Sequence, residues 1–201
     1  MASTCRYLRN NMKIIWMLMG AMIMSSSAQA SEAKAIFAGG CFWCMESEFQ
    51  EQGGISSVVS GYTGGKEINP TYEQVSAHKT GHVEAVEVTY DPAKVSYQKL
   101  LDIYWGNIDP TDAGGQFYDR GAQYATVIYY GNEEEKKLAE ASKEKVEKKL
   151  GKPVVTRIEP AQVFYPAEAE HQDFYQTNSG HYNRYVAGSG RKDKLKTIWK
   201  E

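Results

Sequence analysis

The sequence predicts an α/β (α+β) fold, a two-layer sandwich in which a mixed sheet is covered by helices. Short β-rich runs are interleaved with longer runs of helical periodicity, and their connections include both hairpin-like and crossover-like lengths. Residues 31–201 contain no internal repeat, low-complexity tract or linker, and they are enough for one domain with its own core. We therefore expect a single domain at 31–201.

The first half of this domain is expected to hold three strands and two helices. Residues 83–90 alternate apolar and polar side chains, as in a half-buried strand, until Asp91 and Pro92 end it. Residues 96–107 have apolar side chains at helical spacing, with Ser96 as the N-cap. In chain order we expect a buried strand at 35–38, a helix at 42–52 ended by Gly53 and Gly54, and strands at 58–62 and 83–90 before the helix at 96–107.

The second half continues the alternation. We expect a β-branched and aromatic strand at 124–130, a helix at 133–150, a strand at 154–158 and a short helix at 166–175. Gly151 and Pro153 end the helix at 133–150, whose mixed Glu and Lys residues are typical of a solvated face rather than a binding surface.

Residues 1–30 have the pattern of a cleaved secretory signal peptide. Three basic residues and no acidic residue accompany an apolar run at 14–24, and Ala28-Gln29-Ala30 forms a cleavage motif. The apolar run is about 11 residues long, whereas a membrane-spanning helix needs roughly 20. We expect cleavage after Ala30 and export to the periplasm or beyond, and a start at Met12 would make the signal pattern clearer still. An uncleaved anchor is the alternative.

The charge balance argues against a nucleic-acid partner. The whole chain has 23 basic and 25 acidic residues. Removing the leader's Arg6, Arg9 and Lys13 leaves 20 basic against 25 acidic residues, a net charge of about −5, with no basic stripe. We expect no nucleic-acid partner, no membrane span in the mature chain, and a monomer.

Two cysteines remain after the leader that holds Cys5, and they form a Cys-x-x-Cys pair at Cys41 and Cys44. A zinc site would need two more ligands, and the spacings of the four histidines do not form one. A c-type haem site needs His directly after the second cysteine, where Met45 stands. A redox pair remains, because a cysteine at a helix start meets free amides and a dipole that favour its thiolate.

A structural disulfide is the alternative for this pair in an exported protein. The loop it would close is so short that it removes little entropy from the unfolded chain, roughly 2 kcal/mol or less. The residues alone favour redox chemistry and leave the structural disulfide open.

Gly40-Cys41-Phe42-Trp43 followed by Glu46 resembles the active-site signature of peptide methionine sulfoxide reductases of type A. Further motifs of that family follow in order, and the resemblance covers about residues 36–171. They are Gly61-Tyr62-Thr63-Gly64-Gly65, Pro70-Thr71-Tyr72-Glu73-Gln74-Val75, Gly81-His82-Val83-Glu84-Ala85-Val86, Asp109-Pro110-Thr111, Gln116-Phe117-Tyr118-Asp119-Arg120-Gly121 and Gln123-Tyr124.

The resemblance implies a largely antiparallel sheet with flanking helices on a ferredoxin-like core. It also implies an enzyme that reduces the S epimer of methionine sulfoxide, peptidyl or free, and so repairs oxidised proteins. Such an enzyme uses no metal or cofactor, and its partner would be a thioredoxin-like reductant.

By the same resemblance, Cys41 attacks the sulfoxide sulfur and Glu84 protonates the leaving oxygen. The remaining site residues implied are Tyr72 and Tyr124 as hydrogen-bond donors to that oxygen, Asp119 near it through water, and Phe42 and Trp43 around the substrate methyl group. We interpret His82 and His171 as structural.

The attack leaves Cys41 as a sulfenic acid, and Cys44 is the only other thiol beyond the leader. We expect a strained, readily reduced Cys41–Cys44 disulfide, with direct attack by an external thiol as the alternative. The chain departs from the family at Ala125-Thr126, where Arg-Ser is usual, and at Ala169-Glu170, where Asp-Tyr is usual. These departures bear on the preference for free or peptidyl substrate, not on the reaction. A general thiol-disulfide oxidoreductase and a disulfide-stapled binding domain remain rival classes.

Overall fold

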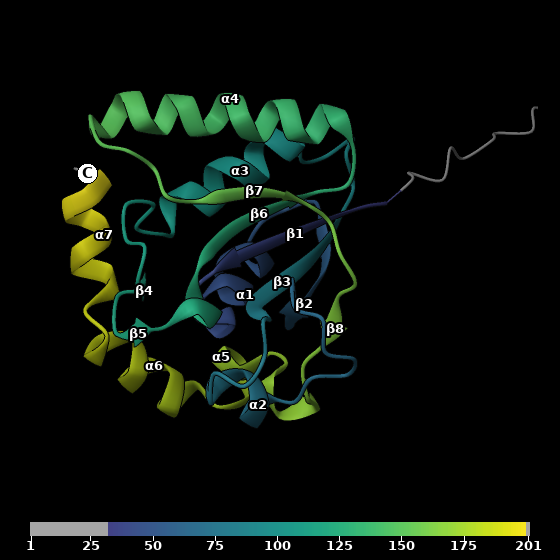
Figure 1. The fold of residues 1–201 in the computed structure, drawn as a ribbon, viewed down its shortest axis with the longest axis vertical. Helices are drawn as coiled ribbons and strands as arrows, with labels where there is room; N and C mark the ends of the chain where they lie inside the picture. The colour runs from purple at the N-terminus through teal and green to yellow at the C-terminus, as the bar shows by residue number, and fades with distance from the viewer. Residues whose placement is uncertain (1–31, 200–201) are drawn as a thin grey trace, which may run out of the picture.

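The computed structural model describes residues 32–199, so the expected signal peptide at 1–30 lies outside the described residues. A six-stranded sheet forms the centre of the fold (Figure 1), in the order β7-β6-β1-β3-β2-β8. All its neighbours pair antiparallel except β6 and β7, which are parallel. The strands are β1 (Ala33–Gly39), β2 (Ile55–Thr63), β3 (Val83–Tyr90), β6 (Thr126–Tyr130), β7 (Arg157–Pro160) and β8 (Tyr165–Pro166).

Helices cover this sheet and surround one end of it. They are α1 (Phe42–Gln50), α2 (Tyr72–Ser76), α3 (Tyr97–Gly106), α4 (Glu133–Leu150), α5 (Phe174–Thr177), α6 (Ser179–Gly188) and α7 (Arg191–Trp199), with 3-10 turns η1 (Ala122–Tyr124) and η2 (Ala169–His171). The succession β1-α1-β2-β3-α3-β6, with strand order β6-β1-β3-β2, is the ferredoxin-like arrangement. The predicted mixed, largely antiparallel sandwich is thus confirmed. A separate small hairpin pairs β4 (Gly115–Gln116) with β5 (Asp119–Arg120).

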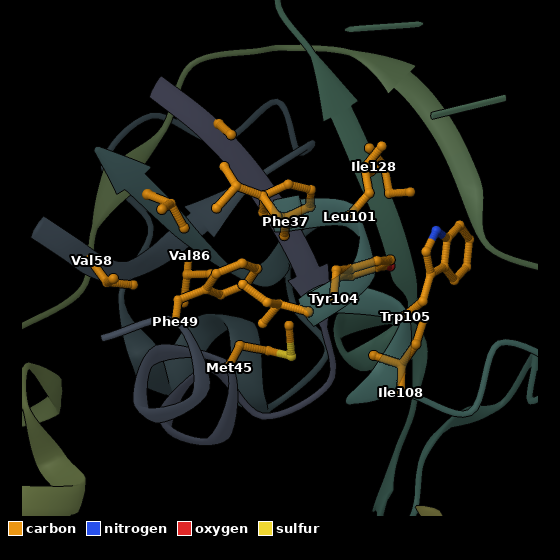
Figure 2. Packing of buried hydrophobic residues seen from close by; sticks show 14 of the residues in the cluster. Phe37, Met45, Phe49, Val58, Val86, Leu101, Tyr104, Trp105, Ile108 and Ile128 are labelled. Atoms are coloured by element: carbon orange, nitrogen blue, oxygen red, sulfur yellow. The ribbon is translucent and has the colours of Figure 1, made fainter. Parts of the chain in front are cut away.

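The main core lies between the sheet and the layer of α1 and α3. Figure 2 shows Phe37 from β1 and Val86 from β3 meeting Phe49 from α1 and Tyr104 from α3. Phe37 stacks on both rings, at centroid distances of 5.2 Å to Phe49 and 5.3 Å to Tyr104. Burial of these large apolar side chains is what holds α1 against the strands.

The two-residue period of β3 decides where its polar side chains lie. Val86 and Val88 belong to the core under the helices, whereas Val83 and Ala85 belong to a smaller cluster on the opposite face of the sheet. Glu84 has the parity of Val86 and is buried. The strand therefore places this carboxyl on the helix-covered face, next to the start of α1.

Most predicted elements are present, with boundary shifts. Ser96 caps α3 by accepting from the Lys99 amide, and Gly151 ends α4 in the left-handed conformation at φ 62°. Half of the residues of α4 are exposed and only Ala139, Ser142 and Val146 are buried, which agrees with the solvated face that the mixed charges predict. The strand expected at 124–130 begins only at Thr126, because Tyr124 closes the η1 turn onto Gly121.

Two predictions in the last third were wrong. The strand expected at 154–158 begins three residues later, as β7 (Arg157–Pro160). The reason is that the Val155 amide donates its hydrogen bond to the Pro110 carbonyl rather than to the sheet. The helix expected at 166–175 is replaced by β8, η2 and α5. Asp173 there is left-handed, at φ 51°, and its amide bonds to the Glu46 carboxylate, so tertiary contacts interrupt the helix.

The helices α2, α6 and α7 and the β4–β5 hairpin were not predicted. Among residues 32–199, no helix combines the length and apolar character needed to cross a lipid bilayer.

Candidate active site

Cys41 occupies the N-cap of α1, directly after β1 and Gly40. Gly40 has φ 85°, and a Cβ there would lie 2.6 Å from the Gln116 Cβ, so only glycine fits this sharp turn. The Cys41 side chain makes no capping hydrogen bond. Its carbonyl accepts the amide hydrogens of Cys44 and Met45, so the backbone is fixed while the sulfur remains available.

Seven of the eight predicted site residues line one cavity of about 250 Å³, and Cys44 is the exception. Five separate elements supply them, far apart in the sequence. Cys41, Phe42 and Trp43 come from the start of α1, Tyr72 from α2, Glu84 from β3, Asp119 from β5 and Tyr124 from η1.

Glu84 is a carboxyl held in its protonated form. Its side chain is 2 % exposed, and its Oε2 accepts a hydrogen bond of 3.0 Å from the Phe42 amide. Burial raises the pKa of Glu84 to about 8, despite the opposing effect of that bond. At neutral pH the group is therefore mostly protonated, which is the state that an acid needs.

The two phenols lie in the same cavity as this carboxyl. Burial raises the pKa of Tyr72 to about 12 and the pKa of Tyr124 above its ordinary value. Both therefore keep their protons as hydrogen-bond donors at neutral pH. Tyr72 is placed by α2, which begins with a capping box at Thr71. The backbone amide of Tyr72 also donates a hydrogen bond of 2.9 Å to the Glu168 side chain.

Asp119 reaches the cavity from the β4–β5 hairpin. The Tyr185 hydroxyl of α6 donates a hydrogen bond to its Oδ2. Burial raises the pKa of Asp119, and the bond from Tyr185 opposes that rise. The hairpin and the C-terminal helices thus meet at a polar contact on the cavity wall.

Trp43 forms the aromatic wall together with a supporting layer behind it. Its ring stacks on Phe174 at 3.8 Å between centroids, and its indole nitrogen donates to His171 Nδ1 at 3.3 Å. His171 also packs against Tyr72 at 4.3 Å, and it does not line the cavity. Burial lowers the pKa of His171, so it is neutral and acts as a support, in agreement with the structural interpretation.

Cys44 lies outside the cavity, one turn further along α1. Its side chain is 1 % exposed and packs with Cys41 and with Val186 of α6. Both cysteines are free thiols in this structure, and the interaction between them raises the pKa of Cys41 and lowers the pKa of Cys44. Of the two thiols in the described part of the chain, Cys41 is therefore the one that a substrate in the cavity meets.

The sequence model described as "Peptide methionine sulfoxide reductase" matches residues 33–201. The chain belongs to this family. The peptide methionine sulfoxide reductase MsrA of Bacillus velezensis is 54% identical over 175 residues, covering 85% of this chain and 99% of that protein. The chain is thus an oxidoreductase of the methionine sulfoxide reductase type.

Solved structures of the family have the same fold. Mxr1 of Saccharomyces cerevisiae in its reduced form has a TM-score of 0.71 and 28% identity, covering 75% of this chain and 88% of that chain. Methionine sulfoxide reductase A of Corynebacterium diphtheriae has a TM-score of 0.68 and 30% identity, covering 76% and 77%.

The protonation of the cysteine pair in this reductase differs from the sequence prediction. Cys41 does stand at the start of α1, but burial raises the pKa of its thiol well above the usual range, and the bond to Cys44 raises it further. The expected resting thiolate at Cys41 was therefore wrong, because desolvation outweighs the helix terminus. The bond from Cys41 lowers the pKa of Cys44 instead.

Sequence reasoning missed Tyr118 and Tyr185, which complete the wall of the cavity in this reductase. Tyr118 stands inside a family motif, so its position could have been noted. Tyr185 lies in α6, whose sequence has few aliphatic residues to indicate a buried face. His82 has the structural surroundings expected of it, since its two ring nitrogens bond to the Gly65 amide and the Glu67 carbonyl.

Proposed function

We propose that this reductase converts the S epimer of methionine sulfoxide, in proteins and peptides or as the free amino acid, to methionine. The observation that supports this most directly is the content of the cavity. A single nucleophilic sulfur, a buried protonated carboxyl and two phenols face the same space of about 250 Å³. Sulfoxide reduction needs this set, because a nucleophile must attack sulfur while the oxygen receives a proton.

In the first step the Cys41 sulfur attacks the sulfoxide sulfur. Glu84 gives its proton to the oxygen, and hydrogen bonds from Tyr72 and Tyr124 stabilise the negative charge that builds there. The proton released by the Cys41 thiol restores Glu84. The sulfoxide sulfur gains two electrons and Cys41 loses two, so the products are methionine and Cys41 sulfenic acid.

Phe42 and Trp43 are proposed to hold the terminal methyl group of the substrate, and Asp119 to order water beside the oxygen. Both aromatic rings line the cavity next to Cys41. The stacking of Trp43 on Phe174 fixes one wall of this apolar contact. A fixed wall restricts how the sulfoxide can lie, which is the basis expected for discrimination between the two epimers.

Cys44 is proposed to resolve the sulfenic acid. Its sulfur attacks Cys41, a disulfide forms, and the oxygen leaves as water after taking a proton. A thioredoxin-like dithiol of the host then reduces that disulfide by thiol exchange. Support for this step comes from the packing of Cys44 against Cys41 and from the lowered pKa of the Cys44 thiol beside it.

The experiment that tests the function uses the separate S and R epimers of a methionine sulfoxide peptide with the dithiothreitol-reduced protein. We expect methionine from the S epimer alone. Turnover of the R epimer instead would contradict the proposal. Turnover of neither epimer, together with reduction of protein disulfides, would indicate a general thiol-disulfide oxidoreductase.

Replacement Cys44→Ser is expected to separate the two half-reactions. Because Cys44 does not line the cavity, the variant should still release about one methionine per protein, and it should then stop with a thioredoxin-like donor. Quench-flow counting of methionine against enzyme, followed by steady-state turnover, measures both. Undiminished steady-state turnover would show that an external thiol attacks the sulfenic acid directly.

We propose that the protein acts outside the cytoplasm, because residues 1–30 have the composition of a signal peptide. Its donor would then be an exported thioredoxin-like protein. Mass spectrometry of the N-terminus in fractionated cells tests this. Recovery only from the cytoplasm with residues 1–30 intact would contradict it.

A further inference from the structure

Arg191 is a buried cation that the reaction described above does not use. It is the first residue of α7, and it is 5 % exposed. In Figure 1, α6 and α7 run along one side of the molecule, beside the β4–β5 hairpin. Burial of a charge is costly, so a buried guanidinium requires compensating contacts.

The contacts of Arg191 are dipoles and polarisable groups. Its Nη2 donates to the Asn107 carbonyl and lies 3.8 Å from the Met45 sulfur, and its guanidinium lies 4.8 Å from the centre of the Phe117 ring. Within residues 32–199 it forms no ion pair with a carboxylate. The positive charge is therefore held in place without being neutralised.

This charge lies close to the segment of α1 that holds Cys44. Met45, which Arg191 contacts, is the next residue along α1, and Val186, which packs on Cys44, lines the same small cavity as Arg191. That cavity, of about 240 Å³, is distinct from the substrate cavity. Arg191 thus lines the small cavity rather than the substrate cavity.

The groups that face Cys44 oppose one another. The interaction with Cys41 lowers the pKa of Cys44 most, and the charge of Arg191 and the Tyr182 hydroxyl also lower it. Burial and the charge of Asp119 raise it. Tyr182 is itself held by a contact of 2.7 Å between its oxygen and Ser47 Oγ. Glu48 faces Arg191 from α1 across the small cavity and partly offsets its charge. Among the described residues, Arg191 is the cation whose charge lowers the pKa of Cys44, while the exposed Lys192 also lines the small cavity.

We propose that Arg191 is a positioning residue that holds Cys44 as the thiolate which attacks oxidised Cys41. The inference rests on the proposed resolving role of Cys44. The interaction between the Cys41 and Cys44 thiols is present only while Cys41 is a thiol. It is lost once Cys41 has become a sulfenic acid. From that moment, the charge of Arg191 and the Tyr182 hydroxyl are the groups that continue to favour a thiolate at Cys44, and the charge is the larger effect.

The step is balanced with the groups already present. The Cys44 thiolate attacks the sulfur of the Cys41 sulfenic acid, a sulfur–sulfur bond forms, and the sulfur–oxygen bond breaks. The oxygen takes up a proton and leaves as water. Arg191 lines the small cavity and not the substrate cavity, although its charge also lowers the pKa of Asp119 on the substrate-cavity wall. Because Asp119 only orders water in the proposed first step, methionine should still form without Arg191.

The test uses the full chain with Cys5→Ser, so that only Cys41 and Cys44 can react. Replacement Arg191→Met removes the charge, and Arg191→Lys keeps it. Lys192→Met is the matched control, since it removes an exposed charge one residue along. We expect the burst of methionine to be kept in all three. Disulfide formation should slow about tenfold or more in Arg191→Met only, since a tenfold loss of thiolate corresponds to one pKa unit.

The pH dependence of disulfide formation provides a readout that a purely structural role would not change. Its midpoint should move to higher pH in Arg191→Met, and raising the pH should restore the rate. An equal loss of burst and disulfide formation, with no rescue at high pH, would show that Arg191 only supports the fold. Unchanged disulfide formation would also overturn the inference.

A second measurement does not depend on turnover. In the Cys5→Ser, Cys41→Ser protein, Cys44 is the only thiol, and its thiolate absorbs at about 240 nm. Adding Arg191→Met should raise the titration midpoint by about one pH unit. Equal titration midpoints with and without Arg191→Met would overturn the inference. This holds even if the variants that contain both Cys41 and Cys44 do not fold. Loss of the methionine burst in the Cys5→Ser parent would instead contradict the proposed function.

Discussion

Replacement of Cys41 by serine should remove turnover of the S epimer almost completely, by about 10³-fold or more. Within the described residues 32–199, Cys41 is the only thiol that lines the substrate cavity. A serine hydroxyl is a far weaker nucleophile toward sulfur, and no base adjoins it in this site. Steady-state assays with the S epimer, and a search for any first-turnover methionine, measure this loss.

The fold should survive this change, which makes the loss interpretable. Cys41 stands at the N-cap of α1 without a side-chain capping bond, and serine is among the preferred residues at such a position. The thermal unfolding midpoint of Cys41→Ser should therefore equal or exceed that of the parent. Cys44→Ser is the matched control, since it also removes one thiol but keeps the burst. Persisting methionine formation in Cys41→Ser would assign the attack to another group.

The part of the fold that follows from local pattern was predictable. In β3 the alternation of side chains indicates a strand, and in α4 the flanking Gly151 marks the end of the helix. The segment after Tyr165 was not predictable in this way. Its backbone amides bond to distant side chains, as the Asp173 amide does to Glu46, and such contacts have no signal in the local sequence.

The residues of the candidate site also divide into those that the sequence predicted and those that it did not. The pair of Cys41 and Glu84 was found because both stand in family motifs, and the register of β3 explains why Glu84 is buried rather than exposed. The contributions of Tyr185 and Arg191 were missed, because both come from C-terminal helices that have little apolar periodicity. The prediction of a thiolate at Cys41 was wrong for a related reason. The burial of Cys41 depends on α6, and this helix was not predicted from the sequence.

Replacement Glu84→Gln should lower the rate of the first half-reaction by about 10²- to 10⁴-fold. Glutamine keeps the shape of the side chain and can still accept the bond from the Phe42 amide, but it cannot release a proton to the sulfoxide oxygen. The methionine burst in rapid-quench experiments measures the step directly. Glu87→Gln, on the same strand but on the other face, is the matched control and should retain the parent rate. A burst of normal rate in Glu84→Gln would assign the acid to another group.

The same replacement should increase stability at alkaline pH. The folded-state pKa of Glu84 is about 8, above an ordinary value of 4.5, so between these values the folded protein holds a proton that the unfolded chain has lost. The contribution of Glu84 to the free energy of unfolding is therefore largest below about pH 4.5 and falls as the pH rises toward 8. The slope reaches at most about 1.4 kcal/mol per pH unit.

Glutamine has no proton to lose, so the difference in unfolding free energy between Glu84→Gln and the parent should grow in favour of the variant across that range. Urea unfolding at several pH values, with Glu87→Gln beside it, measures this difference. A pH-independent difference would show that Glu84 has an ordinary pKa and is ionised in the resting enzyme. The carboxyl would then lack the proton that the proposed first step takes from it. Loss of activity together with gain of alkaline stability, in one variant, would identify Glu84 as a group kept protonated for catalysis at a cost to the fold.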